Sequence, residues 1–228
     1  MQLVDDLSAV AALVLYAAGT AALFAARSLQ QMRSTGGSGL RGLTSTRLRR
    51  AERLGQLCFG LAALAGLLSP LLAALHVLPV YGHREGRLQQ NELVGVLDWV
   101  GLVGAAGGIA VAFLALHIMV SVPGTGVDPA HRSAQAPSGV LAVIRNPIFT
   151  AQMALQAGTA LIAPTSLAVA GMAAAVLACQ IQTRLVEEPY LLAVHGSAYR
   201  SYAARTGRFL PWLGSLPAVS LPGEPALH

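Results

Sequence analysis

Charged and polar side chains gather in the last third of the chain, beside long apolar runs. The turn Arg145–Pro147 precedes one such run, and Arg184, Glu187 and Glu188 follow the next. Charged groups next to apolar segments of membrane length cost free energy to bury, so they indicate a functional site. The region 139–211 is therefore the candidate for chemistry.

The turn Arg145–Pro147 has features of an anion site. Proline suits the first turn of a helix and pushes the residues before it away from helical geometry. Arg145 would then lie beside a helix N-terminus, and both are positive, so a carboxylate would be stabilised there. Taken alone, Arg145 is better explained as an interface arginine that extends its side chain toward lipid headgroups.

The second group of charges allows two interpretations. Spacings of three and four residues place Arg184 on the same helix side as Glu187 and Glu188. These residues either form an interfacial ion pair that ends a helix, or form a site in which an acid contacts hydroxyl or amino groups and the arginine holds an anion. Tyr199 and Tyr202 follow in an amphipathic juxtamembrane segment, and aromatic belts alone explain tyrosines there.

The composition shows that membrane helices must position these residues. The chain has 228 residues, of which 54% are hydrophobic and 11% charged, whereas soluble domains carry roughly 25% charged residues. All fifteen basic residues are arginines that bracket apolar runs. They form no basic stripe interleaved with aromatic residues, so the expected partners are membrane lipids and not nucleic acid.

The apolar runs predict an all-α integral membrane bundle of about five transmembrane helices, because a span needs about 20 apolar residues. The runs cover residues 7–26, 55–77, 97–120, 148–163 and 165–186. The last two predict a helical hairpin, followed by a juxtamembrane cap. The predicted units are a membrane platform (1–134), a cofactor-binding region (135–211) and a flexible tail (212–228).

The arginines also predict the orientation in the cell membrane. Alternate sides of the five spans hold thirteen and two arginines. Because arginine-rich connections stay in the cytoplasm, we expect the N-terminus outside and the C-terminus with the candidate site inside.

Two further patterns concern packing and metals. Gly101, Gly104, Gly107 and Gly108 lie on nearby turns of one predicted span, which favours close helix packing over a groove for a lipid chain. The cysteines and histidines share no metal-ligand spacing, so the sequence predicts no metal site.

The polar motifs as an ordered set resemble the C-terminal half of the isoprenylcysteine carboxyl methyltransferase family, which belongs with the membrane-embedded phospholipid methyltransferases. The motifs are Gly139-x5-Arg145-Asn146-Pro147-Ile148-Phe149, Arg184-x2-Glu187-Glu188, Gly196-x2-Tyr199-x2-Tyr202 and Phe209-Leu210-Pro211. The likeness covers about a third of the chain. Asn146, Phe149 and Ala151 stand where the family usually has histidine, tyrosine and glycine.

The resemblance implies S-adenosylmethionine as cofactor and a lipophilic acceptor, such as an isoprenylcysteine-like carboxylate, an isoprenoid acid or a lipid. It places Arg145, Asn146, Pro147, Phe149, Glu187, Glu188 and Tyr199 near the cofactor. We expect Arg184, or less readily Arg145, to orient an acceptor anion, and Glu188 or Glu187 to help an amine acceptor lose its proton. O-methyl transfer is expected, with N- or S-methyl transfer left open.

Two alternatives remain at this point. Sterol reductases resemble these methyltransferases in the C-terminal hairpin, and an NADPH-dependent reductase would use more cations around Arg200, Arg205 and Arg208. A non-catalytic membrane scaffold is the other alternative, in which the polar residues only terminate helices.

Overall fold

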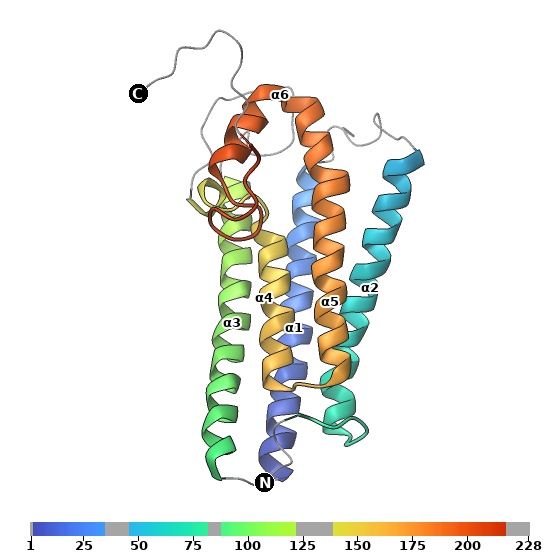
Figure 1. The fold of residues 1–228 in the computed structure, drawn as a ribbon, viewed down its shortest axis with the longest axis vertical. Coiled ribbons are helices and arrows are strands. Elements are labelled where there is room, and N and C mark those ends of the chain that lie inside the picture. Colours follow the sequence, from blue (N-terminus) through green and yellow to red (C-terminus); the bar gives the residue numbers. More distant parts are fainter. Residues whose placement is uncertain (1, 35–45, 82–87, 122–138, 218–228) are drawn as a thin grey trace.

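A computed structural model describes residues 2–34, 46–81, 88–121 and 139–217. The protein is mostly helical, at 83%, which confirms the predicted helical class. The helices are α1 (Gln2–Ser34), α2 (Thr46–Ala74), α3 (Leu88–Ser121), α4 (Pro147–Ile162), α5 (Ser166–Ile181) and α6 (Glu188–Arg205), with a 3-10 helix η2 (Gly139–Ala142) and a π-helical turn η3 (Gln182–Glu187) (Figure 1).

Four helical stretches in the described part of the chain are long and apolar enough to cross a membrane. They are Leu7–Ala25, Arg50–Ala74, Gly95–Ala115 and Ser166–Arg205. Large apolar side chains along them are exposed, including Phe24 at 72% and Val103 at 66%. A lipid environment accommodates such a surface, whereas soluble monomers rarely expose large contiguous apolar patches. Helix α4 has 16 residues, which is shorter than the roughly 20 that a span needs.

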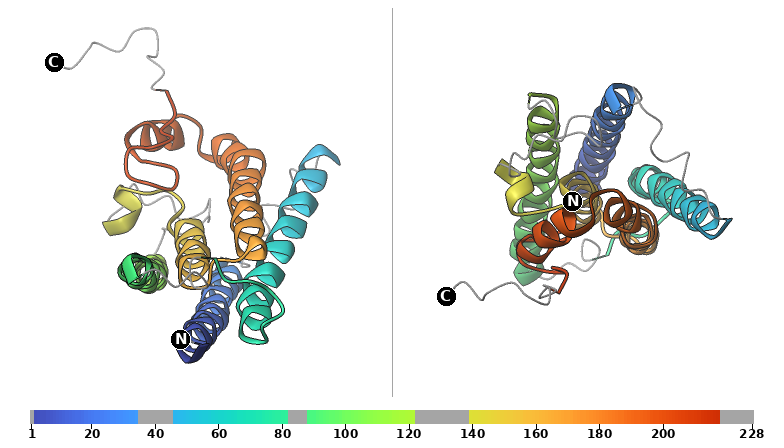
Figure 2. Two further views of the ribbon diagram at one scale, coloured as in Figure 1. Left: turned by 60° about the horizontal axis from the view of Figure 1, so that its bottom comes forward. Right: turned by 90° about the horizontal axis from the view of Figure 1, so that it is seen from above.

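Helix α4 lies inside the bundle and contacts α1, α3 and α5, while α5 packs mainly against α2 (Figures 1 and 2). Residues 163–165 connect α4 to α5, and Thr165 caps α5 by accepting a hydrogen bond from the Ala168 amide. The predicted platform and the predicted cofactor-binding region therefore pack directly against each other.

Small residues bring α3 and α4 together. A Cβ atom on Gly101 would lie 2.5 Å from the Gly158 carbonyl oxygen, and one on Gly108 would lie 2.9 Å from the Ala151 carbonyl oxygen. Close packing is thus confirmed for Gly101 and Gly108. Gly104 and Gly107 lie on the open side of α3, where an added Cβ would meet nothing within 4 Å.

The chain reverses direction within α6. The π-helical turn η3 leads into α6, where Gly196 has a φ of 53°. Positive φ is readily available only to glycine, so this residue permits the bend within α6. As a result α6 runs back toward the start of α4 (Figure 1).

Candidate functional site

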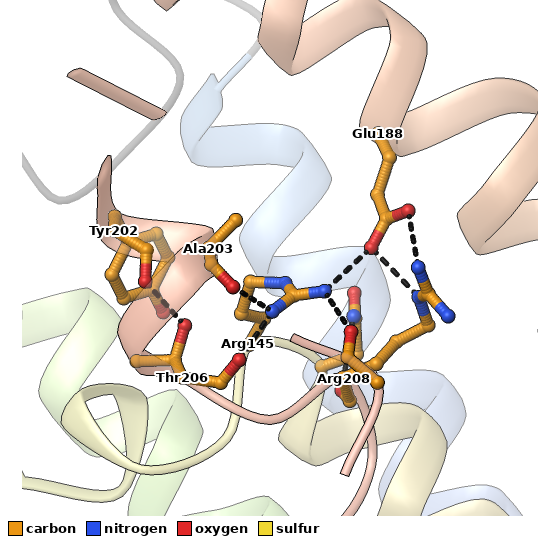
Figure 3. A network of polar contacts seen from close by, with 8 residues as sticks. Arg145, Glu188, Tyr202, Ala203, Thr206 and Arg208 are labelled. Carbon is orange, nitrogen blue, oxygen red and sulfur yellow. Dashed lines mark hydrogen bonds and ion pairs between the residues drawn. The ribbon is translucent and has the colours of Figure 1, made fainter. Parts of the chain in front are cut away.

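A buried glutamate lies between two arginines where α6 meets the start of α4 (Figure 3). Arg145 Nη2 lies 2.9 Å from Glu188 Oε1. Arg208 Nε lies 2.8 Å from the same oxygen, and Arg208 Nη2 lies 3.0 Å from Glu188 Oε2. The Arg145 and Glu188 side chains are only 2% and 7% exposed. We call Arg145, Glu188 and Arg208 the polar cluster.

The backbone brings Arg145 and Arg208 together. The Arg145 amide donates to the Gly207 carbonyl at 2.8 Å, and the Asn146 amide donates to the Arg208 carbonyl at 3.1 Å. These bonds continue a parallel bridge between Ile144 and Gly207. Residues 206–214, which we call the strap, are therefore held against the turn that begins α4.

Arg145 also donates to backbone carbonyls of α6 and the strap. Nη1 donates to the carbonyls of Ala203, at 2.8 Å, and Thr206, and Nη2 donates to the Gly214 carbonyl at 2.9 Å. These bonds and the one to Glu188 use all four N–H groups on the terminal nitrogens. The fifth donor, Nε, is buried and has no hydrogen-bond partner among the described residues.

The polar cluster carries an excess of positive charge, because two guanidinium groups share one carboxylate. Burying such charges is favourable only when they are paired and their hydrogen bonds are satisfied. The excess charge and the free donor of Arg145 both suit an anion.

Asn146 and Phe149 lie on the strap side of α4. The Asn146 side-chain amide donates to the Arg208 carbonyl at 3.1 Å and does not cap the helix. Phe149 is buried, stacks on Phe59 with ring centroids 5.7 Å apart, and packs with Phe209 of the strap. Pro147 is the first residue of α4 and is buried, as its position at a helix start favours.

Tyr199 lies on α6 close to the polar cluster. It is 7% exposed, within electrostatic reach of Arg145 and Glu188, and meets the Tyr202 ring edge-on at 6.0 Å. The Tyr202 hydroxyl donates to the Leu141 carbonyl at 2.6 Å. This bond ties α6 to η2.

Arg184 lies outside the polar cluster, contrary to the expected α-helical pairing with Glu188. It is exposed on η3, and the Glu188 carboxylate bonds Arg145 and Arg208 instead. The π-helical geometry of η3 changes the angular spacing that an α-helix gives to residues four apart. Glu187, on the same turn, is half-buried.

The structure therefore brings Arg145, Asn146, Pro147, Glu188 and Tyr199 to one end of the bundle, with Phe149 one turn further along α4. Sequence reasoning did not place Arg208 in the site. Two features could have identified Arg208. It lies directly before Phe209, at a motif already noted, and a buried Glu188 needs a second cation.

The strap also reaches into the predicted flexible tail. Gly214 accepts a hydrogen bond from Arg145, and the Leu216 amide donates to the Ala203 carbonyl at 3.0 Å. The first residues of that tail are therefore tied to the bundle, and the remainder, 218–228, lies outside the described residues.

Comparison with known proteins adds no family to this picture. No protein-family model matches the chain, and neither a curated protein nor a solved structure matches it. Among the residues that the structure describes, no group of three or more His, Cys, Asp or Glu side chains is placed to hold a metal ion.

Proposed function

We propose that the protein is an integral membrane methyltransferase that uses S-adenosylmethionine and a lipophilic acceptor, similar to the isoprenylcysteine carboxyl methyltransferases. One observation carries the proposal. Arg145 comes from the turn before α4, Glu188 and Tyr199 come from two other motifs on α6, and the three meet in one buried group. Helix termination alone does not require this convergence.

The chemistry of these side chains suits the cofactor. S-adenosylmethionine carries a carboxylate, an ammonium group, ribose hydroxyls and an adenine ring. The free Nε donor of Arg145 and the excess positive charge suit the carboxylate. Glu188 suits the ammonium group or a hydroxyl pair, and Tyr199 is an aromatic partner for adenine. Phe149 could stack on adenine only after its contact with Phe209 of the strap opened.

The protein's part in the reaction would be positioning and exclusion of water. When bound, the cofactor supplies a methyl group on a sulfonium, which is open to in-line displacement. A carboxylate acceptor is already deprotonated and needs no general base, so orientation is the main contribution and supplies about 7–11 kcal/mol in favourable cases. An amine acceptor would need Glu188 or Glu187 to take its proton.

The proposed topology has five spans, with α4 as the short fourth span and with α4 and α5 as the hairpin beneath a cap formed by α6. The N-terminus is outside and the polar cluster is cytoplasmic. The polar cofactor would then arrive from the cytosol, and the acceptor would arrive sideways through the bilayer. The exposed apolar faces of α1 and α3 support lipid contact on that route.

A specific observation also favours a second candidate, a non-catalytic scaffold. Four N–H groups of Arg145, both oxygens of Glu188 and the side-chain amide of Asn146 already have partners within the protein. In this candidate the polar cluster only attaches the strap to the bundle. A cofactor would have to exchange contacts with the strap, so the methyltransferase proposal requires the strap to move.

Ligand titration separates the candidates. We would titrate purified protein in detergent with S-adenosylhomocysteine and, separately, with NADPH, and record thermal unfolding. Stabilisation by the first ligand alone supports methyl transfer, and stabilisation by NADPH alone supports the reductase. No stabilisation by either ligand favours the scaffold.

Two variants test the site assignment. Asn146→Ala and Glu188→Gln should weaken binding of S-adenosylhomocysteine, because the first removes a polar group and the second removes a negative charge from the proposed site. Gly107→Ala, on the open face of α3, is the matched control and should bind as the parent does. Equal affinity in all four proteins would remove the site assignment, and transfer of labelled methyl groups into lipid extracts would then identify any acceptor.

A further inference from the structure

The strap ends in a tight turn that exposes three large apolar side chains. The Leu213 amide donates to the carbonyls of Leu210, at 3.2 Å, and Pro211, at 2.8 Å, and the Arg208 amide donates to the Leu213 carbonyl at 2.7 Å. The turn thus satisfies these backbone groups itself. Its side chains point outward, with Leu210 52%, Trp212 82% and Leu213 63% exposed.

Trp212 has an unusual backbone conformation. Its φ is 61°, a left-handed value that a bulky residue rarely adopts and that the surrounding structure must enforce. The exposed indole gains little packing within the protein in return. A large aromatic residue held in a strained and exposed position indicates a contact outside the chain.

The turn is fixed in place by the rest of the strap. Gly207 pairs with Ile144, Phe209 is buried against Phe149, and Thr150 donates to the Phe209 carbonyl at 2.6 Å. Gly207 has no space for a Cβ because the Leu210 carbonyl packs against it. Leu210–Leu213 is therefore a rigid projection and not a frayed end.

The projection lies where the apolar part of the bundle ends. Figures 1 and 2 show the strap beside the start of α4 and next to η2. Val143, whose carbonyl accepts a hydrogen bond from the Gly207 amide of the strap at 3.0 Å, is itself 42% exposed. The span within α3 ends at Ala115, several residues before the helix does. Tryptophan is enriched at this level of a membrane, since its ring is apolar and its N–H can bond to headgroups.

Exposed arginines on the helix before the strap favour an anionic surface. Arg200 and Arg205 of α6, which leads into the strap, are both exposed. Arginines near a membrane surface attract anionic lipids. Because the protein is anchored in the same bilayer, the turn stays close to the lipid headgroups, and their effective concentration around it is high.

We propose that the turn Leu210–Leu213 inserts into the headgroup region of an anionic bilayer, with Trp212 as its anchor and Arg200 and Arg205 as its electrostatic attachment. This contact holds the strap over the polar cluster from the membrane side. The proposal goes beyond methyl transfer and does not depend on it, since it concerns a lipid surface and not a cofactor.

Tryptophan fluorescence tests the insertion, because the chain has only two tryptophans. The variant Trp99→Phe leaves Trp212 as the sole reporter, and Trp212→Phe leaves Trp99 within α3 as the matched control. Each variant would be placed as a single copy in nanodiscs of phosphatidylcholine, with or without phosphatidylglycerol. The lipids would carry a nitroxide quencher either near the headgroup (shallow) or at the acyl-chain end (deep).

We expect Trp212 emission to be blue-shifted, protected from acrylamide, and quenched more by the shallow nitroxide than by the deep one. Phosphatidylglycerol should increase this quenching severalfold, and Arg200→Gln with Arg205→Gln should abolish the increase. Trp99 should show no dependence on phosphatidylglycerol.

Three outcomes would overturn the proposal. Trp212 could remain open to acrylamide and unquenched by either nitroxide, which excludes insertion. Quenching that is equal with and without phosphatidylglycerol would exclude the anionic surface. Protection that appears only with two copies in each nanodisc would assign the turn to a contact between copies of the chain.

Discussion

The interior of the bundle and the polar cluster bury polar groups in opposite ways. In the middle of the bundle, neutral groups link the helices: the Tyr16 hydroxyl donates to the Ala62 carbonyl at 3.3 Å, and the hydroxyls of Ser69 and Thr165 lie 2.7 Å apart. In the polar cluster the groups are charged, and two arginines share one glutamate.

The two regions also differ in how their partners are brought together. Glycines make room in the interior, as at Gly66, where the Tyr16 ring fills the space of a Cβ. In the polar cluster the partners come from the α4 turn, from α6 and from the strap. Neutral bonds of the interior are sufficient to align helices, whereas buried charges are costly and weak evidence for stability. The difference therefore points to the polar cluster as the region under functional demand.

The largest effect should follow from removing the shared carboxylate. Glu188→Gln leaves the buried guanidinium group of Arg145 and the partly buried one of Arg208 without their counter-charge, and breaking a buried pair in this way costs about 3–5 kcal/mol. We expect the free energy of unfolding to fall by this amount in denaturant titrations in mixed micelles. Glu52→Gln, at an exposed position of α2, is the control, and an equal loss in both variants would contradict the role given to Glu188.

A smaller loss should follow from filling the interface of α3 and α4. Gly158→Ala adds a methyl group where the Gly101 carbonyl and Ala105 leave no space, and overpacking costs about 1–3 kcal/mol. Gly107→Ala makes the same substitution in open space within α3, so it should not destabilise, and the higher helix propensity of alanine should raise the free energy of unfolding by up to about 1 kcal/mol. If the two variants unfold alike, α3 and α4 are not packed as closely as described.

Local rules in the sequence predicted much of this interior. The apolar run 7–26 corresponds to the span Leu7–Ala25, and the run 97–120 overlaps Gly95–Ala115. The glycines of α3 predicted close packing, although the sequence did not tell Gly101 and Gly108 from the open Gly104 and Gly107. That distinction depends on which face of α3 meets α4, and the neighbouring helix decides it.

The polar cluster was predictable only in part. Arg145 and Glu188 were identified because charge beside an apolar run is unusual, which is a local signal. Arg208 was not, because its pairing depends on the strap turning back onto the start of α4. Arg184 was expected to face Glu188, and the π-helical turn η3 prevents that alignment. Long-range backbone pairing and local helix geometry leave little trace in residue spacing.

Thr165 has two roles in the interior, a hydroxyl bond to Ser69 and the cap of α5, and removing them should have a still smaller effect on the free energy of unfolding. Ser69→Ala removes one hydroxyl bond, and such bonds between membrane helices contribute about 0.6 kcal/mol on average. Thr165→Ala removes this bond and also the cap of α5, and losing a cap costs about 1 kcal/mol. Thr165→Ala should therefore destabilise more, as measured by denaturant titration, and equal losses would mean that the cap contributes nothing.

The smallest effect on stability should come from Arg184, and it tests whether charge alone defines the functional region. Arg184 is exposed, so Arg184→Ala should change the free energy of unfolding by about 0.5 kcal/mol or less. Arg208→Ala removes an equal charge but leaves Glu188 with one partner and the strap without its ion pair, so it should destabilise clearly more.

In a methyl-transfer assay, an acceptor-orienting role for Arg184 predicts unchanged affinity for S-adenosylhomocysteine and slower turnover of an anionic acceptor. Unchanged turnover would confine the site to the buried residues, because Arg184 would then contribute to neither folding nor catalysis.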